Sequence, residues 1–453
     1  MSSGPGAGSA PASLTENDKV STFGSFQVRN YRIHFFGNAI SNIGTWMQRI
    51  AQDWLVHELT GSAAAVGVTL ALQFLPMLLF GLYGGVLADR FDKRMLLIGT
   101  QAVLGVTGLS LAALTFTGVV NVYHVYALAL VVGLVTVVDN PARQTFVSDM
   151  VGPRLLRNAV SLNSANFQSA RLIGPAVAGV LIAAVGGAWA FLINGLSFVA
   201  PIIGLLMMRT SELTRAERVP RGRGQLREGL RYVGGRPDLL WVIVLVGFIG
   251  TFGYNFAIWL VAFTDQVFAS GAGTYGLLNS LMAAGSVIGA LLAARRGSSR
   301  IRFTVAAAAV FAVLLVVASA APNFLTFALL MPLIGLAGMT FQVTANSTVQ
   351  ISTDPAMRGR VISLFMMVFV GGTPFGGPLV GWLSDAFGAR IGLLGGAVVC
   401  LAAAVGVAMM LARVGGLRLR ISLRAGRRGV AFVPREESRE APAPAGAAVR
   451  PAA

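Results

Sequence analysis

Apolar residues run along this chain in long blocks, and short polar segments separate the blocks. Most blocks have about 20 residues, the length of helix that crosses the hydrocarbon core of a bilayer. Some contain Gly and Pro, which membrane helices tolerate better than helices in water. The pattern predicts an all-α membrane protein with twelve transmembrane helices, at residues 33–58, 64–88, 95–117, 122–141, 159–185, 188–208, 239–263, 273–295, 303–321, 324–346, 360–382 and 390–412.

The composition supports a lipid environment. Of the 453 residues, 55% are hydrophobic and 12% are charged, whereas soluble domains have about 25% charged residues. The net charge of +17 does not indicate a nucleic-acid partner, because the basic residues lie in short segments between apolar blocks. The single cysteine, Cys400, excludes a disulfide within the chain. Residues 1–28 lack the apolar stretch of a signal peptide and predict a disordered cytoplasmic tail.

The basic residues also orient the helices. If both termini are cytoplasmic, almost all Lys and Arg outside the helices fall on the inner side, and the outer loops hold only Arg390. Cytoplasmic loops of membrane proteins carry such an excess of positive charge. We therefore expect a multi-pass protein of the bacterial inner or plasma membrane. Residues 414–453, rich in Arg and then in Pro and Ala, predict a disordered cytoplasmic tail.

An internal repeat divides the chain. The basic loop 209–238 separates a six-helix bundle at 29–208 from a second six-helix bundle at 239–413. The two halves share short motifs in the same order, and the clearest pair has Gly174, Pro175 and Gly179 in the first half and Gly377, Pro378 and Gly381 in the second. Two pseudo-symmetric halves are typical of secondary transporters.

The loop after the second helix carries a family signature. Its sequence reads Gly85-Val-Leu-Ala-Asp89-Arg90-Phe-Asp92-Lys93-Arg94. This segment resembles the signature of the major facilitator superfamily between helices 2 and 3. The resemblance implies a cytoplasmic gate in which Asp89 pairs near the start of the eleventh helix. Arg90, Lys93 and Arg94 would keep the loop inside; alternatively, the loop only sets the topology.

Further motifs narrow the resemblance. The Gly174-Pro175 segment resembles the antiporter motif of the superfamily, which is associated with export by exchange. A proline bends a helix and glycine allows close packing, so the same segment also suits an ordinary kinked helix. Together with residues 44–48, 58–62 and 139–144, it is similar to the drug:proton antiporter branch, which includes enterobactin exporters and macrolide efflux proteins. The resemblance covers residues 28–412 and does not specify a substrate.

A polar stripe on the first helix is the main candidate for a substrate and proton pathway. Polar groups inside a membrane are costly and therefore informative. At about 100° per residue, seven polar side chains of this helix fall on one face. Arg49 and Asp53 are one turn apart and can pair, either to couple proton movement or as a static pair. The stripe comprises His34, Asn38, Asn42, Thr45, Arg49, Gln52 and Asp53, and Trp46 belongs to the same pathway.

Other helices add candidate residues. Arg171 could attract an anionic substrate, or bond a carbonyl freed by the bend at Pro175. Asp139 and Arg143 form a cytoplasmic gate or a structural pair, in preference to the alternative that Asp139 is a proton site. The seventh helix has an aromatic face with Asn255 and Trp259, which suits either an organic substrate or ordinary packing. The tenth helix has a polar face with Gln342 and Asn346. These four residues complete the pathway candidates.

The sequence favours a secondary active transporter over other classes. It contains no phosphate loop with Gly-Lys-Ser/Thr and no metalloprotease motif, so we expect neither an enzyme nor a metal site nor a cofactor. The expected function is proton-coupled efflux of a small organic molecule, such as a drug, an antibiotic or a siderophore-like compound, by a monomer driven by the proton gradient. An importer, an uncoupled facilitator or a non-transporting sensor or scaffold of the same fold are the alternatives.

Overall fold

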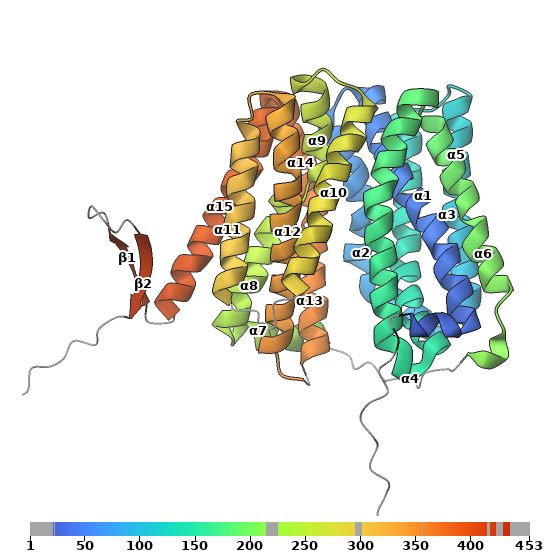
Figure 1. The fold of residues 1–453 in the computed structure, drawn as a ribbon, viewed down its shortest axis with the longest axis horizontal. Helices are drawn as coiled ribbons and strands as arrows, with labels where there is room; N and C mark the ends of the chain where they lie inside the picture. Colours follow the sequence, from blue (N-terminus) through green and yellow to red (C-terminus); the bar gives the residue numbers. More distant parts are fainter. Residues whose placement is uncertain are drawn as a thin grey trace, which may run out of the picture. The chain divides into compact units, whose positions relative to one another are not determined.

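The computed structural model describes residues 21, 23–213, 225–294, 301–355, 357–414, 417–422 and 429–434. Contacts divide the chain into two units, which Figure 1 shows as helix bundles coloured along the sequence. Unit 1 comprises residues 1–52 and 79–220, and unit 2 comprises residues 53–78 and 221–453. The last part of α1 and the first part of α2 therefore belong to unit 2.

Unit 1 is built from helices. It contains η1 (Gly24–Gln27), the first part of α1 (Arg29–Thr60), the last part of α2 (Ala63–Arg90), α3 (Lys93–Phe116), α4 (Val122–Val185), α5 (Gly187–Ser197), α6 (Val199–Leu206) and η2 (Thr210–Glu212).

Unit 2 repeats this construction with more interruptions. It contains α7 (Gln225–Gly234), α8 (Pro237–Phe248), the π-helix η3 (Ile249–Gly253), α9 (Phe256–Ala262), the π-helix η4 (Phe263–Val267), α10 (Ala272–Ala294), α11 (Ile301–Ser319), α12 (Phe324–Ser352), α13 (Arg358–Gly371), α14 (Thr373–Phe387), α15 (Ala389–Val414), β1 (Leu417–Ser422) and β2 (Gly429–Pro434). The strands pair antiparallel, within the segment where the sequence favours disorder.

Twelve transmembrane helices account for the described part of the chain. Ten helical stretches are long and apolar enough to cross a membrane. One of them, α4, has 64 residues and is interrupted at Gly152, where φ is +68°, so it supplies two spans. The helix α1, with 32 residues, supplies the twelfth span. Its polar stripe lowers its mean hydropathy, so it is not among the ten apolar stretches. The predicted all-α membrane fold is confirmed.

The fourth span is longer than the sequence predicts. The expected helix ended at residue 141, but the observed helix continues to Val151, before the break at Gly152. Pro141 lies inside the helix, and the Thr145 hydroxyl one turn later donates to the Pro141 carbonyl at 2.9 Å. The extension brings Arg143 and Asp149 onto a membrane helix.

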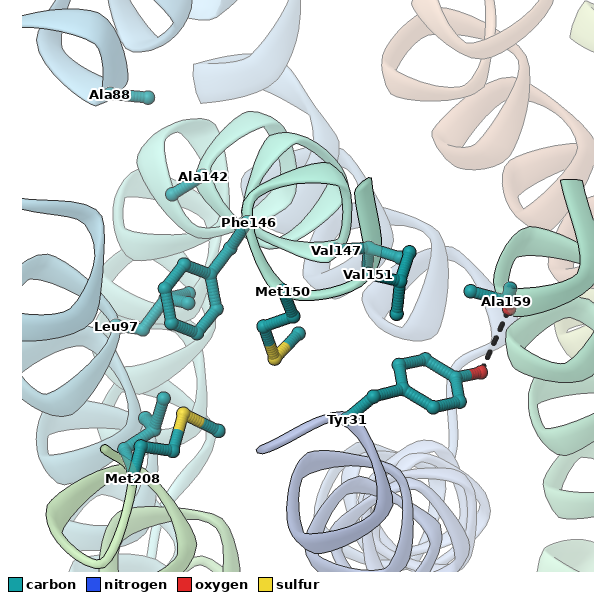
Figure 2. Packing of buried hydrophobic residues seen from close by; sticks show 11 residues of the cluster. Tyr31, Ala88, Leu97, Ala142, Phe146, Val147, Met150, Val151, Ala159 and Met208 are labelled. Carbon is teal, nitrogen blue, oxygen red and sulfur yellow. Dashed lines mark hydrogen bonds between the residues drawn. The ribbon is translucent and has the colours of Figure 1, made fainter. Parts of the chain in front are cut away.

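An apolar cluster fixes the ends of these helices in unit 1 (Figure 2). Phe146 and Met150 of α4 pack with Leu97 of α3 and Tyr31 of α1, and all four are at most 5% exposed. The Tyr31 hydroxyl donates to the Ala159 carbonyl at 2.9 Å. Between membrane helices such contacts stabilise through van der Waals packing, because lipid is as apolar as these side chains. The polar network described next lies on the same helices.

Candidate transport site

The structure buries most of the polar stripe on α1. His34, Asn38, Gln52 and Asp53 are between 1% and 7% exposed, and Asn42 is half-buried. Polar side chains without water must find partners in the protein. The stripe therefore faces other helices over most of its length.

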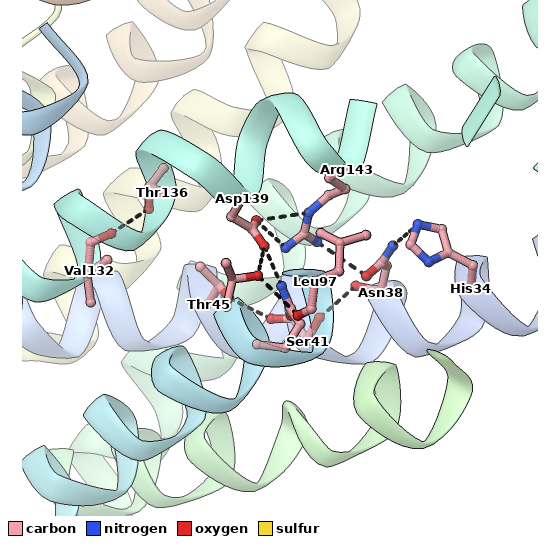
Figure 3. Close-up of polar contacts among 11 residues, drawn as sticks. His34, Asn38, Ser41, Thr45, Leu97, Val132, Thr136, Asp139 and Arg143 are labelled. Carbon is pink, nitrogen blue, oxygen red and sulfur yellow. Dashed lines mark hydrogen bonds and ion pairs between the residues drawn. The ribbon is translucent and has the colours of Figure 1, made fainter. Parts of the chain in front are cut away.

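Asp139 of α4 is the centre of a buried network in unit 1 (Figure 3). One carboxylate oxygen accepts from Thr100 Oγ1 at 2.7 Å and from Gln101 Nε2 at 2.8 Å. The other accepts from Nη2 of Arg143 at 2.7 Å and from its Nε at 3.2 Å. All four contacts come from donors, which is the pattern of an ionised carboxylate. The side chain of Asp139 is 5% exposed and that of Arg143 is 26% exposed.

The network continues to the stripe on α1. Arg143 Nη1 donates to Asn38 Oδ1 at 3.2 Å, and Asn38 Nδ2 lies 2.8 Å from Nε2 of His34. Charged hydrogen bonds are stronger than neutral ones, so Arg143 is a firm link between α4 and α1. The sequence predicts Asn38 as a pathway residue and Asp139 with Arg143 as a gate. It does not predict the hydrogen bond from Arg143 to Asn38.

Two arginine side chains lie close to the ring of Trp46 on α1. The guanidinium carbon of Arg49 lies 5.2 Å from the indole centroid, and that of Arg171 lies 5.7 Å from it. Phe167 of α4 meets the same ring edge-on at 5.6 Å. Cation–π contacts of this kind contribute about 0.5–2 kcal/mol each. Three of the predicted pathway residues thus form one cluster in unit 1.

Glycine and proline of the bend motif let α4 approach α1. A Cβ at Gly174 would lie 2.5 Å from Cβ of Trp46 and 3.0 Å from the backbone nitrogen of Met47. Pro175 and Gly179 are buried inside the same helix. The close approach at Gly174 holds Trp46 beside Arg171.

The C-terminal end of α1, which belongs to unit 2, has partners in that unit. The hydroxyl of Tyr275 on α10 donates to Oδ2 of Asp53 at 3.1 Å. His57 Nε2 lies 3.1 Å from Oδ2 of Asp265, whose side chain is 53% exposed. Asp53 and His57 are buried. The carboxylate predicted to pair with Arg49 thus also accepts from Tyr275, a partner that the sequence did not indicate.

Asp385 of α14 caps the first turn of α2 within unit 2. Its carboxylate accepts from Ser62 Oγ at 2.6 Å and from the backbone nitrogens of Ala63 at 2.8 Å and Ala64 at 2.9 Å. A carboxylate is stabilised at the positive N-terminal end of a helix. This contact joins the second transmembrane helix to the eleventh.

The glycines of the second bend motif bring α14 against α2. A Cβ at Gly381 would lie 2.5 Å from Cα of Ala64. A Cβ at Gly67 would lie 2.6 Å from the carbonyl carbon of Gly377 and 2.8 Å from the nitrogen of Pro378. Side chains at these glycines would collide with backbone, so the close contact depends on them.

The predicted aromatic face of the seventh span is interior. Asn255 and Trp259 are each 1% exposed, and the Asn255 side-chain nitrogen donates to the Thr251 carbonyl at 2.7 Å. The Trp259 ring packs against Phe256 at 5.8 Å and Phe327 at 6.2 Å. Among the described residues, the Asn255 side-chain oxygen and the Trp259 indole nitrogen have no hydrogen-bond partner.

The polar face of α12 is half-buried. Asn346 accepts from Nε2 of Gln350 at 2.7 Å, and Gln342 lies one turn before Asn346 on the same helix.

The signature loop holds α3 in place. Lys93 Nζ lies 2.7 Å from Oδ2 of Asp149, and the Arg94 guanidinium donates to the carbonyls of Leu205 at 2.6 Å and Leu206 at 3.0 Å. Arg90 is exposed and Gly85 is buried. The side chain of Asp89, predicted to act in the gate, lies outside the described residues.

The basic loop before the second bundle contains the short helix α7. Glu228 of α7 accepts from Arg360 of α13 at 2.9 Å, and the Tyr232 hydroxyl donates to Asp354 at 2.9 Å. The hydrogen bond to Asp238 raises the pKa of Arg236, so this guanidinium stays charged. The helix α7 thus lies against the ends of α12 and α13.

Comparison with known proteins fits this architecture. A family model described as a transmembrane secretion effector matches residues 20–422. The chain belongs to this family. Relatives of this secretion effector are transporters of the major facilitator type, and the protein is itself a membrane transporter of that type rather than an enzyme.

Three curated relatives of this secretion effector illustrate the similarity. The staphyloferrin A transporter of Staphylococcus aureus is 23% identical over 81% of this chain and 94% of its own length. Macrolide efflux protein A of Streptococcus pyogenes is 24% identical, with 82% and 95% covered. The multidrug efflux pump Tap of Mycobacterium tuberculosis is 24% identical, with 78% and 86% covered.

Solved structures share the fold. A bacterial homologue of the human lysosomal transporter Spinster, in an inward-facing conformation, has a TM-score of 0.65 at 14% identity and covers 85% of this chain and 95% of its own. A POT family transporter has a TM-score of 0.69 at 9% identity, with 85% and 96% covered. At these identities the likeness shows the major facilitator fold alone.

Proposed function

We propose that this secretion effector exports a small organic molecule across a bacterial cell membrane in exchange for protons. The protein lies in the inner or plasma membrane with both termini in the cytoplasm, as the placement of its basic residues indicates. It works by alternating access between its two bundles.

The observation that supports proton coupling is the ion pair between the buried carboxylate of Asp139 and the half-buried guanidinium of Arg143. Ionisable side chains inside a membrane are expensive, and they mark proton relays and substrate paths. Protonation of Asp139 would remove the charge that holds Arg143 and would loosen the link from Arg143 to Asn38. Binding of a proton to Asp139 would thereby change the contact between α4 and α1.

Asp53 is the second candidate proton site. Its buried carboxylate accepts from Tyr275, so its protonation would alter the contact between α1 and α10 in unit 2. Arg49 precedes it by one turn on α1, as the sequence predicts. Two acids at different depths suit a cycle in which a proton enters at one side and leaves at the other.

The names of relatives support an organic substrate. They include a siderophore transporter, a macrolide efflux protein and a multidrug efflux pump. The cluster of Trp46, Arg49 and Arg171 offers an aromatic face with two positive charges to a substrate. We propose a drug, an antibiotic or a siderophore-like compound as the cargo.

The test uses inside-out membrane vesicles. A gradient that is acid inside should drive accumulation of radiolabelled erythromycin or of ethidium, and an uncoupler should abolish it. Asp139→Asn and Asp53→Asn should lose this accumulation at normal membrane levels. Asp354→Asn, at the loop contact with Tyr232, is the matched control and should retain it. Accumulation that ignores the gradient would contradict coupling, and substrate movement in the opposite direction would favour an importer.

A further inference from the structure

His34 and Arg143 lie at opposite ends of the Asn38 side chain (Figure 3). Arg143 Nη1 donates to Asn38 Oδ1 at 3.2 Å, and the Asn38 nitrogen lies 2.8 Å from Nε2 of His34. Asn38 is 7% exposed and His34 is 4% exposed. Water therefore has little access to either contact, and the three side chains must satisfy one another.

Donor chemistry fixes the direction of this chain. A guanidinium has only donors, so the end of Asn38 that faces Arg143 must be its oxygen. The other end is then the NH₂ group, which donates. Nε2 of His34 must accept this bond, so it carries no proton, and the neutral imidazole holds its proton on Nδ1. This deduction does not depend on how the amide is drawn, which ordinary coordinates leave to the network.

We propose that His34 is a proton-binding residue of the transport cycle, and that Asn38 couples its protonation to the Asp139–Arg143 pair. The inference rests on the proton-coupled transport proposed above and adds a residue and a linkage to it. In a state of the cycle in which His34 opens to water, a hydronium ion gives its proton to the lone pair of Nε2, and the hydrogen bond from Asn38 breaks. When Nε2 later releases the proton to water, the original bond forms again.

The Asn38 amide cannot hydrogen-bond to both His34 and Arg143 once His34 is charged. The new N–H of His34 faces the NH₂ of Asn38, and two donors do not bond. If the amide turns over, its oxygen accepts from His34, but its NH₂ then faces the donors of Arg143. Protonated His34 and the Arg143–Asn38 bond therefore exclude each other. Binding a proton at His34 weakens the link between α1 and α4.

The charged groups around His34 lie on α4. Burial of the imidazole and then the charge of Arg143 oppose a positive charge on His34, and Asp139 favours it. The ring of Phe146 meets the imidazole edge-on at 5.8 Å. Because Asp139 already binds Arg143, its protonation state and that of His34 act on the same guanidinium. The two sites thus form one coupled unit.

Nitrogen NMR of the purified full-length protein in nanodiscs, labelled at histidine, tests the resting state. The chain has three histidines, and the signal lost in His34→Gln identifies the one of interest. At alkaline pH we expect His34 to carry its proton on Nδ1 with a bare Nε2. A proton on Nε2, or a doubly protonated ring, would overturn the proposal.

Two aspartate substitutions on α1 test the linkage. In Asn38→Asp, a carboxylate can accept from both Arg143 and protonated His34, so the pH at which His34 gains its second proton should rise by about one unit or more. Asn42→Asp places the same charge one turn further along the helix and is the matched control. Equal shifts in the two variants would show a general charge effect and would refute the relay through Asn38.

A transport measurement separates this inference from the proposed function. In proteoliposomes, His34→Gln should lose erythromycin movement driven by a proton gradient but keep erythromycin exchange without a gradient. Full gradient-driven transport by His34→Gln would refute the role of His34 and leave proton coupling through Asp139 standing. Absence of gradient-driven transport in the wild type would refute the proposed function, and with it the part of His34 in the cycle.

Discussion

The carboxylate of Asp385 accepts a hydrogen bond at 2.8 Å from the backbone nitrogen of Ala63, a residue 322 positions earlier in the chain. The first turn of a helix has backbone N–H groups without partners in the helix. Asp385 satisfies two of them in α2 and also binds Ser62. This carboxylate is both a helix cap and a bond between two transmembrane helices.

Removing the cap should loosen the start of α2. We expect Asp385→Ala to cost about 0.5–2 kcal/mol of local stability, as loss of other N-terminal caps does. Amide hydrogen exchange at residues 63–66 should accelerate by about fivefold for each kilocalorie per mole lost. Asp385→Asn keeps an acceptor and should have a smaller effect. Unchanged exchange in Asp385→Ala would show that the contact is not maintained in solution.

The close approach of α4 to α1 should not tolerate a side chain at Gly174. A methyl group there would lie 2.5 Å from Cβ of Trp46, so Gly174→Ala should cost about 1–3 kcal/mol by overpacking. Gly99→Ala on α3 is the control, because a Cβ at Gly99 meets nothing within 4 Å. That change should be neutral or stabilise the helix by up to about 1 kcal/mol. Thermal unfolding in detergent compares the two, and equal melting temperatures would contradict the packing.

Asp139 and Arg143 should depend on each other for stability. Asp139→Asn leaves the half-buried guanidinium of Arg143 without its counter-charge and should cost about 1–3 kcal/mol. Adding Arg143→Gln removes that charge, so the double variant should be more stable than Asp139→Asn alone. Thermal unfolding of the four proteins gives the coupling free energy, which should exceed about 1 kcal/mol. Additive losses would show that the two side chains do not interact.

Cysteine labelling should reveal the orientation of the helices. Phe91 and Val119 are each 60% exposed and lie at opposite ends of α3. Cys400 is 0% exposed and can be replaced by alanine to give a background without thiols. In intact cells, a membrane-impermeant maleimide should label Val119→Cys and not Phe91→Cys. The reverse pattern would place the termini outside.

The twelve helices could be predicted because apolar length is a strong local signal. The predicted ends of most helices lie within a few residues of the observed ends, because short polar segments end these helices. The exception is the fourth helix, where Pro141 suggested an end but lies inside a helix that runs on to Val151. Membrane helices tolerate proline inside a span, so Pro141 alone does not mark a helix end.

The contacts of the candidate site were less predictable than its residues. The stripe on α1 follows from the helical period, and burial of His34, Asn38 and Asp53 agrees with it. The bond from Arg143 to Asn38 joins positions 105 residues apart, and no local pattern encodes it. Asp385 gave no signal at all, because a single acid at the end of a helix is unremarkable until the helix it caps is known.

The helix α2 belongs to two contact units, and its residue Pro76 lies two positions before the boundary at Leu78. Proline has no backbone N–H, so α2 lacks one of its internal hydrogen bonds at this point. A helix bends more easily where one of its internal hydrogen bonds is missing. We therefore expect α2 to bend most easily near Pro76, between the end that Asp385 caps and the end that carries the signature loop.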